Sequence, residues 1–254
     1  MTTPPVQPGA EPFSSPEGRY GALVLHGFTG NPQSMRGLAE AFARAGFATE
    51  LPRLPGHGTS IEDMATTKWD DWAAAADAAY ADLAQRCENV VVAGLSMGGT
   101  LTVWLASKHP EIAGIVVING AVAPLGDAAE LRAPMEELLA AGTEYIPAVG
   151  NDIADPNATE LAYEQTPIRS LVSLFDAVAD LQSRLAEVRC PVLVMNAPED
   201  HIVPPVSSDH LAASVSGPVT RITLERSYHV ATLDYDKDVI EREAVEFAKR
   251  VTGA

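Results

Sequence analysis

Short apolar segments alternate with longer helical segments along most of this chain of 254 residues. We expect strands over 21–25, 47–51, 90–93, 114–118, 192–195 and 219–224, with helices near 33–45, 68–86, 97–108, 170–187, 206–215 and 238–250. Several of these strands are apolar at every position, as parallel strands covered on both faces are. The alternation predicts an α/β fold with a mostly parallel central sheet flanked by helices.

Two segments interrupt this alternation. Residues 1–18 are rich in proline and predict an irregular N-terminal arm. Residues 121–167 are too long for a bare loop in a compact domain, and they contain helix-like pieces near 128–141 and 157–164. An insertion after a sheet strand lies where open α/β sheets bind ligands. We therefore expect a cap (lid) over 121–167, on a core formed by 19–120 and 168–254.

Charge and composition exclude several classes of protein. Lys and Arg number 17 against 34 Asp and Glu, so the net charge of −17 offers no positive field for nucleic acid. No apolar run approaches the roughly 18–20 residues of a membrane span. The first 18 residues lack the apolar core of a secretory signal. Two distant cysteines form neither a disulfide framework nor a zinc motif, so we expect a cytoplasmic protein with reduced thiols.

The motif Gly94-Leu95-Ser96-Met97-Gly98 carries the strongest chemical signal. It matches G-x-S-x-G between an apolar strand and a helix, the context in which a tight turn exposes a nucleophilic serine above the sheet. Small residues at 94 and 98 let the backbone segments approach closely. We therefore expect Ser96 to be a catalytic nucleophile rather than a helix-capping serine.

A serine nucleophile needs a base and a third group that orients the base. In hydrolases with this turn the chain order is nucleophile, acid, histidine. His229 follows the last predicted strand, which makes it the preferred base among the histidines after Ser96. Asp200 follows the strand 192–195 and is the preferred acid, with neighbouring Glu199 as the alternative. Two further acids beyond the histidine, Asp234 and Asp236, break the order and are expected to be surface or capping groups.

Backbone N–H groups near the nucleophile are candidates for an oxyanion hole. The first strand ends in His26-Gly27-Phe28-Thr29-Gly30, where two glycines flank an aromatic residue. We expect the N–H groups of Phe28 and Met97 to stabilise the oxyanion, and His26 to fix its loop by a ring hydrogen bond. No residues have metal-ligand spacing, so we expect neither a metal nor a cofactor.

Six segments together resemble the bacterial monoacylglycerol lipase and carboxylesterase group of the α/β hydrolases. They span nearly the whole chain: HGFTGNPQSMR (26–36), LPRLPGHGTSIEDM (51–64), GLSMGGTLT (94–102), LAYEQTP (161–167), EDHIVPP (199–205) and SYHVATLDYD (227–236). PQSMR, LAYEQTP and the last two segments are more specific than G-x-S-x-G. They indicate the monoacylglycerol lipases rather than the short-chain carboxylesterases.

The resemblance implies an α/β-hydrolase fold, a triad of Ser96, Asp200 and His229, and oxyanion donors at Phe28 and Met97. It also implies that Glu160 contacts the glycerol hydroxyls of the substrate; from the residues alone, a carboxylate on a helix surface is the alternative. The expected function is hydrolysis of monoacylglycerols, with a lipid ester as substrate and transient contact with lipid aggregates. The residues specify no oligomeric state.

Two other functions remain open at this stage. A general carboxylesterase for short acyl esters would use the same catalytic residues with a different acyl pocket. A non-catalytic protein on the same fold would bind a small molecule instead. Nine acidic residues against one arginine in 126–165 place −8 of the net charge on the expected cap. This charge would disfavour anionic headgroups at the entrance, or else serve solubility alone.

Overall fold

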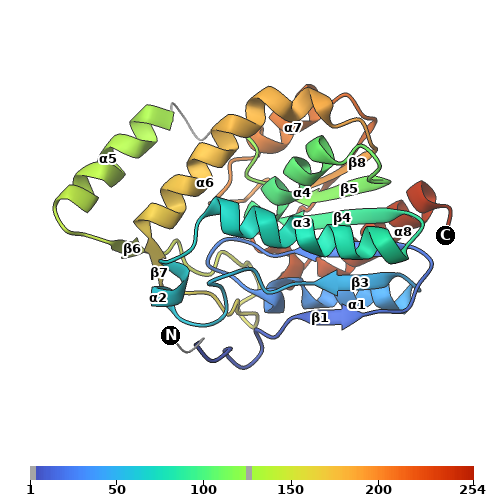
Figure 1. Cartoon of the computed structure of the whole chain (residues 1–254), viewed down its shortest axis with the longest axis horizontal. Helices are drawn as coiled ribbons and strands as arrows, with labels where there is room; N and C mark the ends of the chain where they lie inside the picture. Colours follow the sequence, from blue (N-terminus) through green and yellow to red (C-terminus); the bar gives the residue numbers. More distant parts are fainter. Residues whose placement is uncertain (1–3, 124–127) are drawn as a thin grey trace.

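A seven-stranded sheet forms the centre of the molecule in the computed structural model, which describes residues 4–123 and 128–254 (Figure 1). The strand order is β1-β3-β2-β4-β5-β8-β9, and every neighbouring pair is parallel except β1 with β3. The strands are β1 (Phe13–Ser15), β2 (Gly21–Leu25), β3 (Ala48–Leu51), β4 (Val90–Leu95), β5 (Gly114–Ile118), β8 (Val192–Asn196) and β9 (Val219–Thr223). The predicted α/β class and mostly parallel sheet are therefore confirmed.

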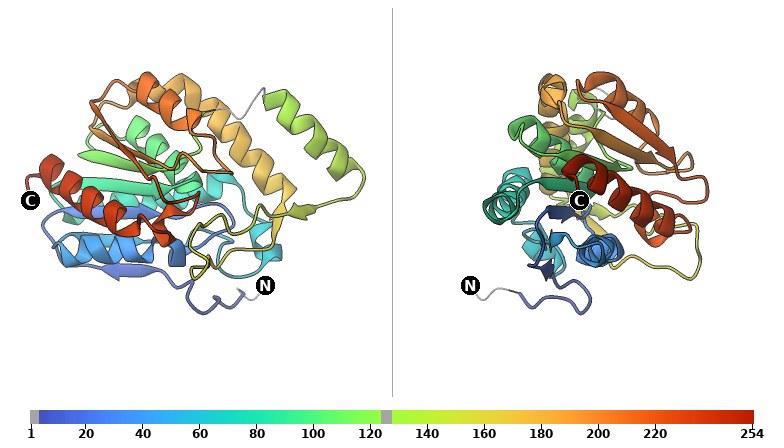
Figure 2. Two further views of the ribbon diagram at one scale, coloured as in Figure 1. Left: turned by 180° about the vertical axis from the view of Figure 1, so that it is seen from behind. Right: turned by 90° about the vertical axis from the view of Figure 1, so that its right-hand side faces the viewer.

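Helices cover both faces of this sheet. On one face lie α1 (Arg36–Arg44) and α8 (Lys237–Thr252), and on the other lie α3 (Trp69–Arg86), α4 (Met97–Lys108) and α6 (Ile168–Leu181) (Figure 2). Successive strand residues point to opposite faces. Ala22 and Val24 accordingly pack against the first layer, while Leu23 and Leu25 pack against the second. Burial on both faces explains why β2, β4, β5 and β8 are apolar at almost every position.

The segment between β5 and α6 extends beyond the sheet. Helix α5 (Ala128–Ala140) packs along α6 at one end of the molecule (Figure 1). A two-stranded antiparallel sheet follows, formed by β6 (Tyr145–Pro147) and β7 (Gln165–Pro167). Residues between these two strands contact the loops that follow β2 and β8, where the N–H of Tyr163 bonds the Thr29 carbonyl and the N–H of His201 bonds Asp152. The described residues also form the α-helices α2 (Ile61–Met64) and α7 (Val206–Ser214) and three short 3-10 helices over Pro32–Met35, Gln182–Glu187 and Ala231–Leu233.

Two expectations about local structure are wrong. The arm is not irregular throughout, because residues 13–15 form the edge strand β1 opposite Leu51, Glu50 and Thr49. An edge strand such as β1 joins the sheet through backbone hydrogen bonds to β3, so its residues need no apolar pattern. The helix expected near 157–164 is absent, since these residues are irregular apart from a turn at 157 and a bend at 164. Gln33 bonds the carbonyl of Thr159 and the N–H of Leu161, so tertiary hydrogen bonds replace those of a helix.

Within residues 4–123 and 128–254, no helix is both long enough and apolar enough to cross a membrane.

Candidate active site

Ser96 lies in a strained turn between β4 and α4. Its φ of 55° is in the left-handed region, which a residue other than glycine adopts only where its surroundings enforce it. The surroundings are backbone atoms: a Cβ on Gly94 would lie 2.1 Å from the Gly98 carbonyl oxygen, and one on Gly98 would lie 2.1 Å from the Leu25 oxygen. Both glycines are thus required for the turn that presents Ser96.

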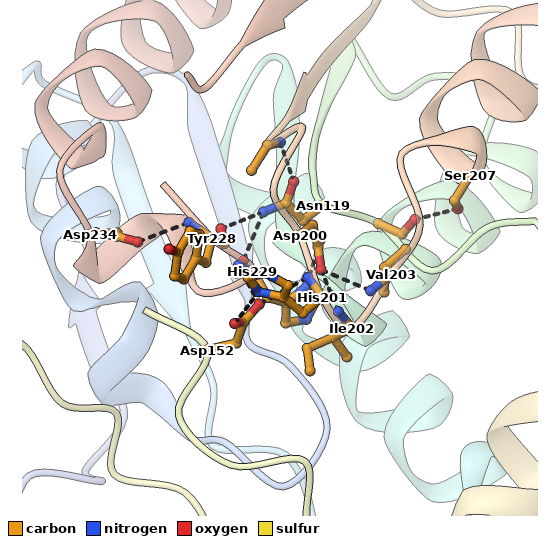
Figure 3. A network of polar contacts seen from close by, with 12 residues as sticks. Asn119, Asp152, Asp200, His201, Ile202, Val203, Ser207, Tyr228, His229 and Asp234 are labelled. Carbon is orange, nitrogen blue, oxygen red and sulfur yellow. Dashed lines mark hydrogen bonds and ion pairs between the residues drawn. The ribbon is translucent and has the colours of Figure 1, made fainter. Parts of the chain in front are cut away.

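Asp200 and His229 come together although 29 positions separate them in the chain. His229 Nδ1 lies 2.8 Å from Asp200 Oδ2, and the two side chains are 9% and 2% exposed. The second oxygen, Oδ1, accepts the N–H groups of Ile202 and Val203 at 2.8 Å each, which fixes the carboxylate plane (Figure 3). A carboxylate only accepts hydrogen bonds, so in the neutral ring Nδ1 of His229 carries the proton and Nε2 is an acceptor. The alternative acid, Glu199, is exposed.

Ser96 and His229 line one cavity of about 250 Å³. The hydrogen bonds within the described part of the chain include none between the Ser96 hydroxyl and the His229 ring. Such bonds are often long without substrate and tighten in the complex. Most of the lining is apolar and comes from both the core and the 121–167 segment; it includes Ile146, Val149, Leu171, Leu174, Phe175 and Val203.

The loop after β2 passes directly beside the predicted nucleophile. A Cβ on Gly27 would lie 3.5 Å from the Ser96 Cβ, and Phe28 lines the cavity. Met97 is the first residue of α4, where the N–H has no intrahelical acceptor. His26 is buried and holds this loop, as expected, because its Nδ1 bonds the Gly27 carbonyl and its Nε2 accepts the Leu54 N–H at 3.1 Å. Burial lowers the pKa of His26 well below its usual value, so the ring is neutral.

Glu160 also lines this cavity, from the irregular segment that follows Asn151. A Cβ on Gly30 would lie 2.6 Å from Glu160 Oε1, so the absent side chain at position 30 leaves the room that this carboxylate fills. Burial raises the pKa of Glu160, while His229 and the Ser34 hydroxyl act in the opposite direction. The structure thus places Glu160 with Ser96 and His229, and the alternative of a carboxylate on a helix surface is wrong.

Asn119 joins the loops of the acid and the histidine, and no sequence motif marks it. It follows β5 with a φ of 44°, and its Oδ1 accepts the Ala197 N–H at 2.8 Å. Its Nδ2 donates to the carbonyls of Tyr228 and His229 at 3.2 and 2.8 Å (Figure 3). The only sequence signal was its place at the end of a buried parallel strand, where polar residues face the ligand edge.

Asp234 and Asp236 are buried, which contradicts their expected place at the surface. Asp234 accepts the N–H groups of Ala154, Asp155 and Tyr228. Asp236 accepts the N–H of Arg226 and bonds the Ser227 hydroxyl, and its side chain does not cap α8. Backbone donors exposed by the irregular loops attract these carboxylates inward. Within 4–123 and 128–254, no group of three His, Cys, Asp or Glu side chains is arranged to hold a metal ion.

The fold and the serine turn define a class of protein, and sequence comparison supplies the family. The family model described as the alpha/beta hydrolase family matches residues 22–242, and the chain belongs to this family. A thermostable monoacylglycerol lipase of Bacillus sp. (strain H-257) is 46% identical over 250 residues, which are 98% of either chain. A carboxylesterase of Bacillus subtilis (strain 168) is 28% identical over 95% of this chain and 97% of its own.

Solved structures agree with this assignment. A structure from a study of LipS and LipT, two metagenome-derived lipolytic enzymes, superposes with a TM-score of 0.91. It is 41% identical and covers 97% of this chain and 100% of its own. A monoacylglycerol lipase of Paleococcus ferrophilus superposes with a TM-score of 0.77 over 96% of this chain and 99% of its own; at 18% identity it supports the fold alone.

Proposed function

We propose that the protein is a serine hydrolase that cleaves monoacylglycerols into glycerol and a fatty acid, with Ser96, His229 and Asp200 as the catalytic triad. One observation carries the proposal. Ser96, His229 and the carboxylate of Glu160 open into one cavity whose remaining lining is mostly apolar. A monoacylglycerol has one ester, one apolar chain and two hydroxyl groups, and this cavity provides a complementary group for each.

The reaction follows from the proton positions. Ser96 attacks the ester carbonyl while His229 Nε2 takes the hydroxyl proton, and Asp200 holds the ring and stabilises its positive charge. The oxyanion binds the N–H groups of Phe28 and Met97, each of which contributes about 2.7–4 kcal/mol to the barrier reduction. His229 then gives the proton to the departing glycerol oxygen. Water, activated by the same nitrogen, releases the fatty acid from Ser96.

The glycerol end of the substrate is proposed to bind at Glu160, and the acyl chain along the apolar lining. The carboxylate of Glu160 accepts hydrogen bonds from the glycerol hydroxyls, and burial makes such charge-assisted bonds strong. The acyl chain lies along Ile146, Val149 and Phe175. The relative at 46% identity is a monoacylglycerol lipase, which supports the same substrate here.

A general carboxylesterase is the second candidate, favoured by the carboxylesterase relative at 28% identity. The two functions differ in what Glu160 contributes, because a simple alkyl ester offers it no hydroxyl group. The test compares the hydrolysis of monoacylglycerols with that of methyl esters of the same fatty acids. The acyl chains range from roughly 4 to 16 carbons, from a short ester to the chain of a membrane lipid. We expect kcat/KM to favour the monoacylglycerols at every chain length. Equal values for both series would indicate the general carboxylesterase.

The domain organisation is part of the proposal. We assign 121–167 as a cap on a hydrolase core of 19–120 and 168–254, with 1–18 as an N-terminal arm. Lining of the cavity by Ala121, by 146–150 and by Glu160, Ala162, Tyr163 and Thr166 supports the cap assignment. We also propose a cytoplasmic location, which the two free cysteines, Cys87 and Cys190, support. Transient contact with lipid aggregates is proposed from the lipid ester substrate.

A further inference from the structure

Asp152 lies in the cap segment between β6 and β7, yet its carboxylate contacts the loops of both predicted triad partners. We propose that Asp152 is a positioning residue for His229, tying the backbone of the histidine and the loop of the acid to a single oxygen atom. This inference rests on the proposed function, because it assumes that His229 is the base.

The contacts of Asp152 converge on that oxygen. Oδ2 accepts the N–H of His229 at 3.0 Å and the N–H of His201 at 3.1 Å. His201 directly follows Asp200, so the backbone of the base and the backbone next to the acid share one acceptor (Figure 3). The side chain of Asp152 is only 12% exposed. Little water is therefore available to replace these bonds, and the carboxylate fixes the spacing of the two loops.

The orientation of the Asp152 carboxylate is itself fixed. Its second oxygen, Oδ1, lies 2.7 Å from His201 Nδ1, and the His201 ring packs edge-on against Tyr228 with ring centroids 4.6 Å apart. The main-chain carbonyl of Asp152 also accepts the N–H of Val230 at 3.0 Å. Asp152 therefore holds two consecutive N–H groups of the histidine loop, one with its side chain and one with its backbone.

Other residues hold the same loop from different sides, which shows what Asp152 adds. Asp234 accepts the N–H of Tyr228 at 2.9 Å, and Asn119 donates to the carbonyls of Tyr228 and His229. Asp234 and Asn119 belong to the core segments. Asp152 comes from the proposed cap and is the acceptor for the N–H of His229 itself. A tilt of that peptide would move the imidazole relative to Ser96, and a displacement of about 1 Å can cost a hundredfold in rate.

The test compares Asp152→Ala with Asp152→Asn and with Asp155→Ala as a matched control. Asp155 lies three positions along the same segment, and its carboxylate bonds Asn157 within its own loop. An Asn amide oxygen can still accept both N–H groups, while its NH₂ donates to His201 Nδ1 once that ring carries its proton on Nε2. Kinetics on a p-nitrophenyl ester, the labelling rate of Ser96 by a fluorophosphonate and the melting temperature are measured for each variant.

For Asp152→Ala we expect kcat and the labelling rate to fall together, by about 10- to 100-fold, while KM stays within about twofold. Asp152→Asn recovers most of both rates, and Asp155→Ala matches the wild type. A merely structural role would lower the melting temperature and leave both rates of the folded enzyme unchanged. That result would overturn the inference, as would a loss confined to KM.

Two further outcomes have defined meanings. If Asp152→Ala does not fold, Asp152→Ser replaces it: its hydroxyl ends one bond short of the carboxylate oxygens, and the same paired loss of kcat and labelling is expected. Wild-type rates in a folded Asp152→Ser would contradict the inference. Failure of the wild-type enzyme itself to hydrolyse esters or to label would refute the proposed function instead, because the inference concerns only the difference between variants.

Discussion

His229 Nδ1 and Asp200 Oδ2 lie 2.8 Å apart, and Asp200 Oδ1 is occupied by two backbone N–H groups. These three hydrogen bonds leave the carboxylate no other orientation. In the neutral imidazole the proton is therefore on Nδ1, and Nε2 is the nitrogen that can accept a proton. A substitution that preserves the shape of Asp200 but reverses one hydrogen bond tests this arrangement.

Asp200→Asn is expected to lower kcat by about 10³- to 10⁴-fold with little change in the fold. The amide oxygen of the new side chain accepts the N–H groups of Ile202 and Val203, which turns its NH₂ toward His229 Nδ1. The ring must then accept on Nδ1 and carry its proton on Nε2, so it cannot take a proton from Ser96. Steady-state kinetics on a p-nitrophenyl ester measures the loss.

Glu199→Gln is the control for that experiment, since Glu199 neighbours Asp200 but is exposed. We expect it to behave as the wild type. A severe loss in Glu199→Gln together with an active Asp200→Asn would show that Glu199 is the acid.

Gly30→Ala tests the proposed glycerol subsite by displacing the carboxylate of Glu160, without substituting Glu160 itself. The new methyl group would lie 2.6 Å from Glu160 Oε1, which must move because the end of a side chain yields more readily than backbone. A hydrogen bond to a charged group contributes about 1.5–3 kcal/mol, so kcat/KM for monoacylglycerols should fall about 10- to 100-fold.

The matched measurement uses the methyl ester of the same fatty acid, for which Gly30→Ala should keep wild-type kcat/KM. Glu160→Gln should show the same selective loss. An equal loss on both substrates would mean that position 30 affects the catalytic residues rather than recognition of glycerol.

His57 should make the protein less stable in mild acid. Its ring is buried and burial lowers the pKa of His57 to about 4, whereas the ring in the unfolded chain titrates near 6.5. Above pH 6.5 the ring is neutral in both the native and the unfolded state, so His57 does not reduce the free energy of unfolding there. As the pH falls toward 4, the unfolded chain binds a proton that the native state cannot, so His57 costs about 2 kcal/mol of the free energy of unfolding by pH 5.

Urea denaturation at several pH values between 4.5 and 7.5 measures this effect in the wild type and in His57→Gln. As the pH falls over that range, the free energy of unfolding of the variant should decrease less steeply than that of the wild type. The difference in slope corresponds to about one proton bound on unfolding. Parallel pH profiles for the two proteins would show that His57 does not carry the dependence.

The elements that sequence analysis located well are those with a strong local pattern. The helix expected over 97–108 is α4 at the same bounds, because Gly98 and the buried strand before it define the turn that starts the helix. The strands were visible because both faces of the sheet are covered, so apolar runs mark them. The loop position of Asp200 followed from the end of such a strand, whereas that of His229 followed from the end of β9, which has no buried residue.

Features that depend on long-range hydrogen bonds were not visible in the sequence. The non-helical course of 157–164 is held by hydrogen bonds to Gln33, which is more than 120 positions away. Asn119 and Asp152 have ordinary sequence surroundings, and their importance arises only when separate loops meet. The acidic residues of 126–165 differ in burial for the same reason: Asp152 and Glu160 are largely buried, whereas Glu136, Glu137 and Glu144 are exposed.

The most direct test of the proposed function is glycerol release from a monoacylglycerol by the wild type and by Ser96→Ala, with the melting temperature of each. We expect the wild type to release glycerol and fatty acid in equal amounts. Ser96→Ala should lose at least about 10⁴-fold in rate at an unchanged melting temperature, because no other group can form the acyl-enzyme. Continued glycerol release by a folded Ser96→Ala protein would contradict the account.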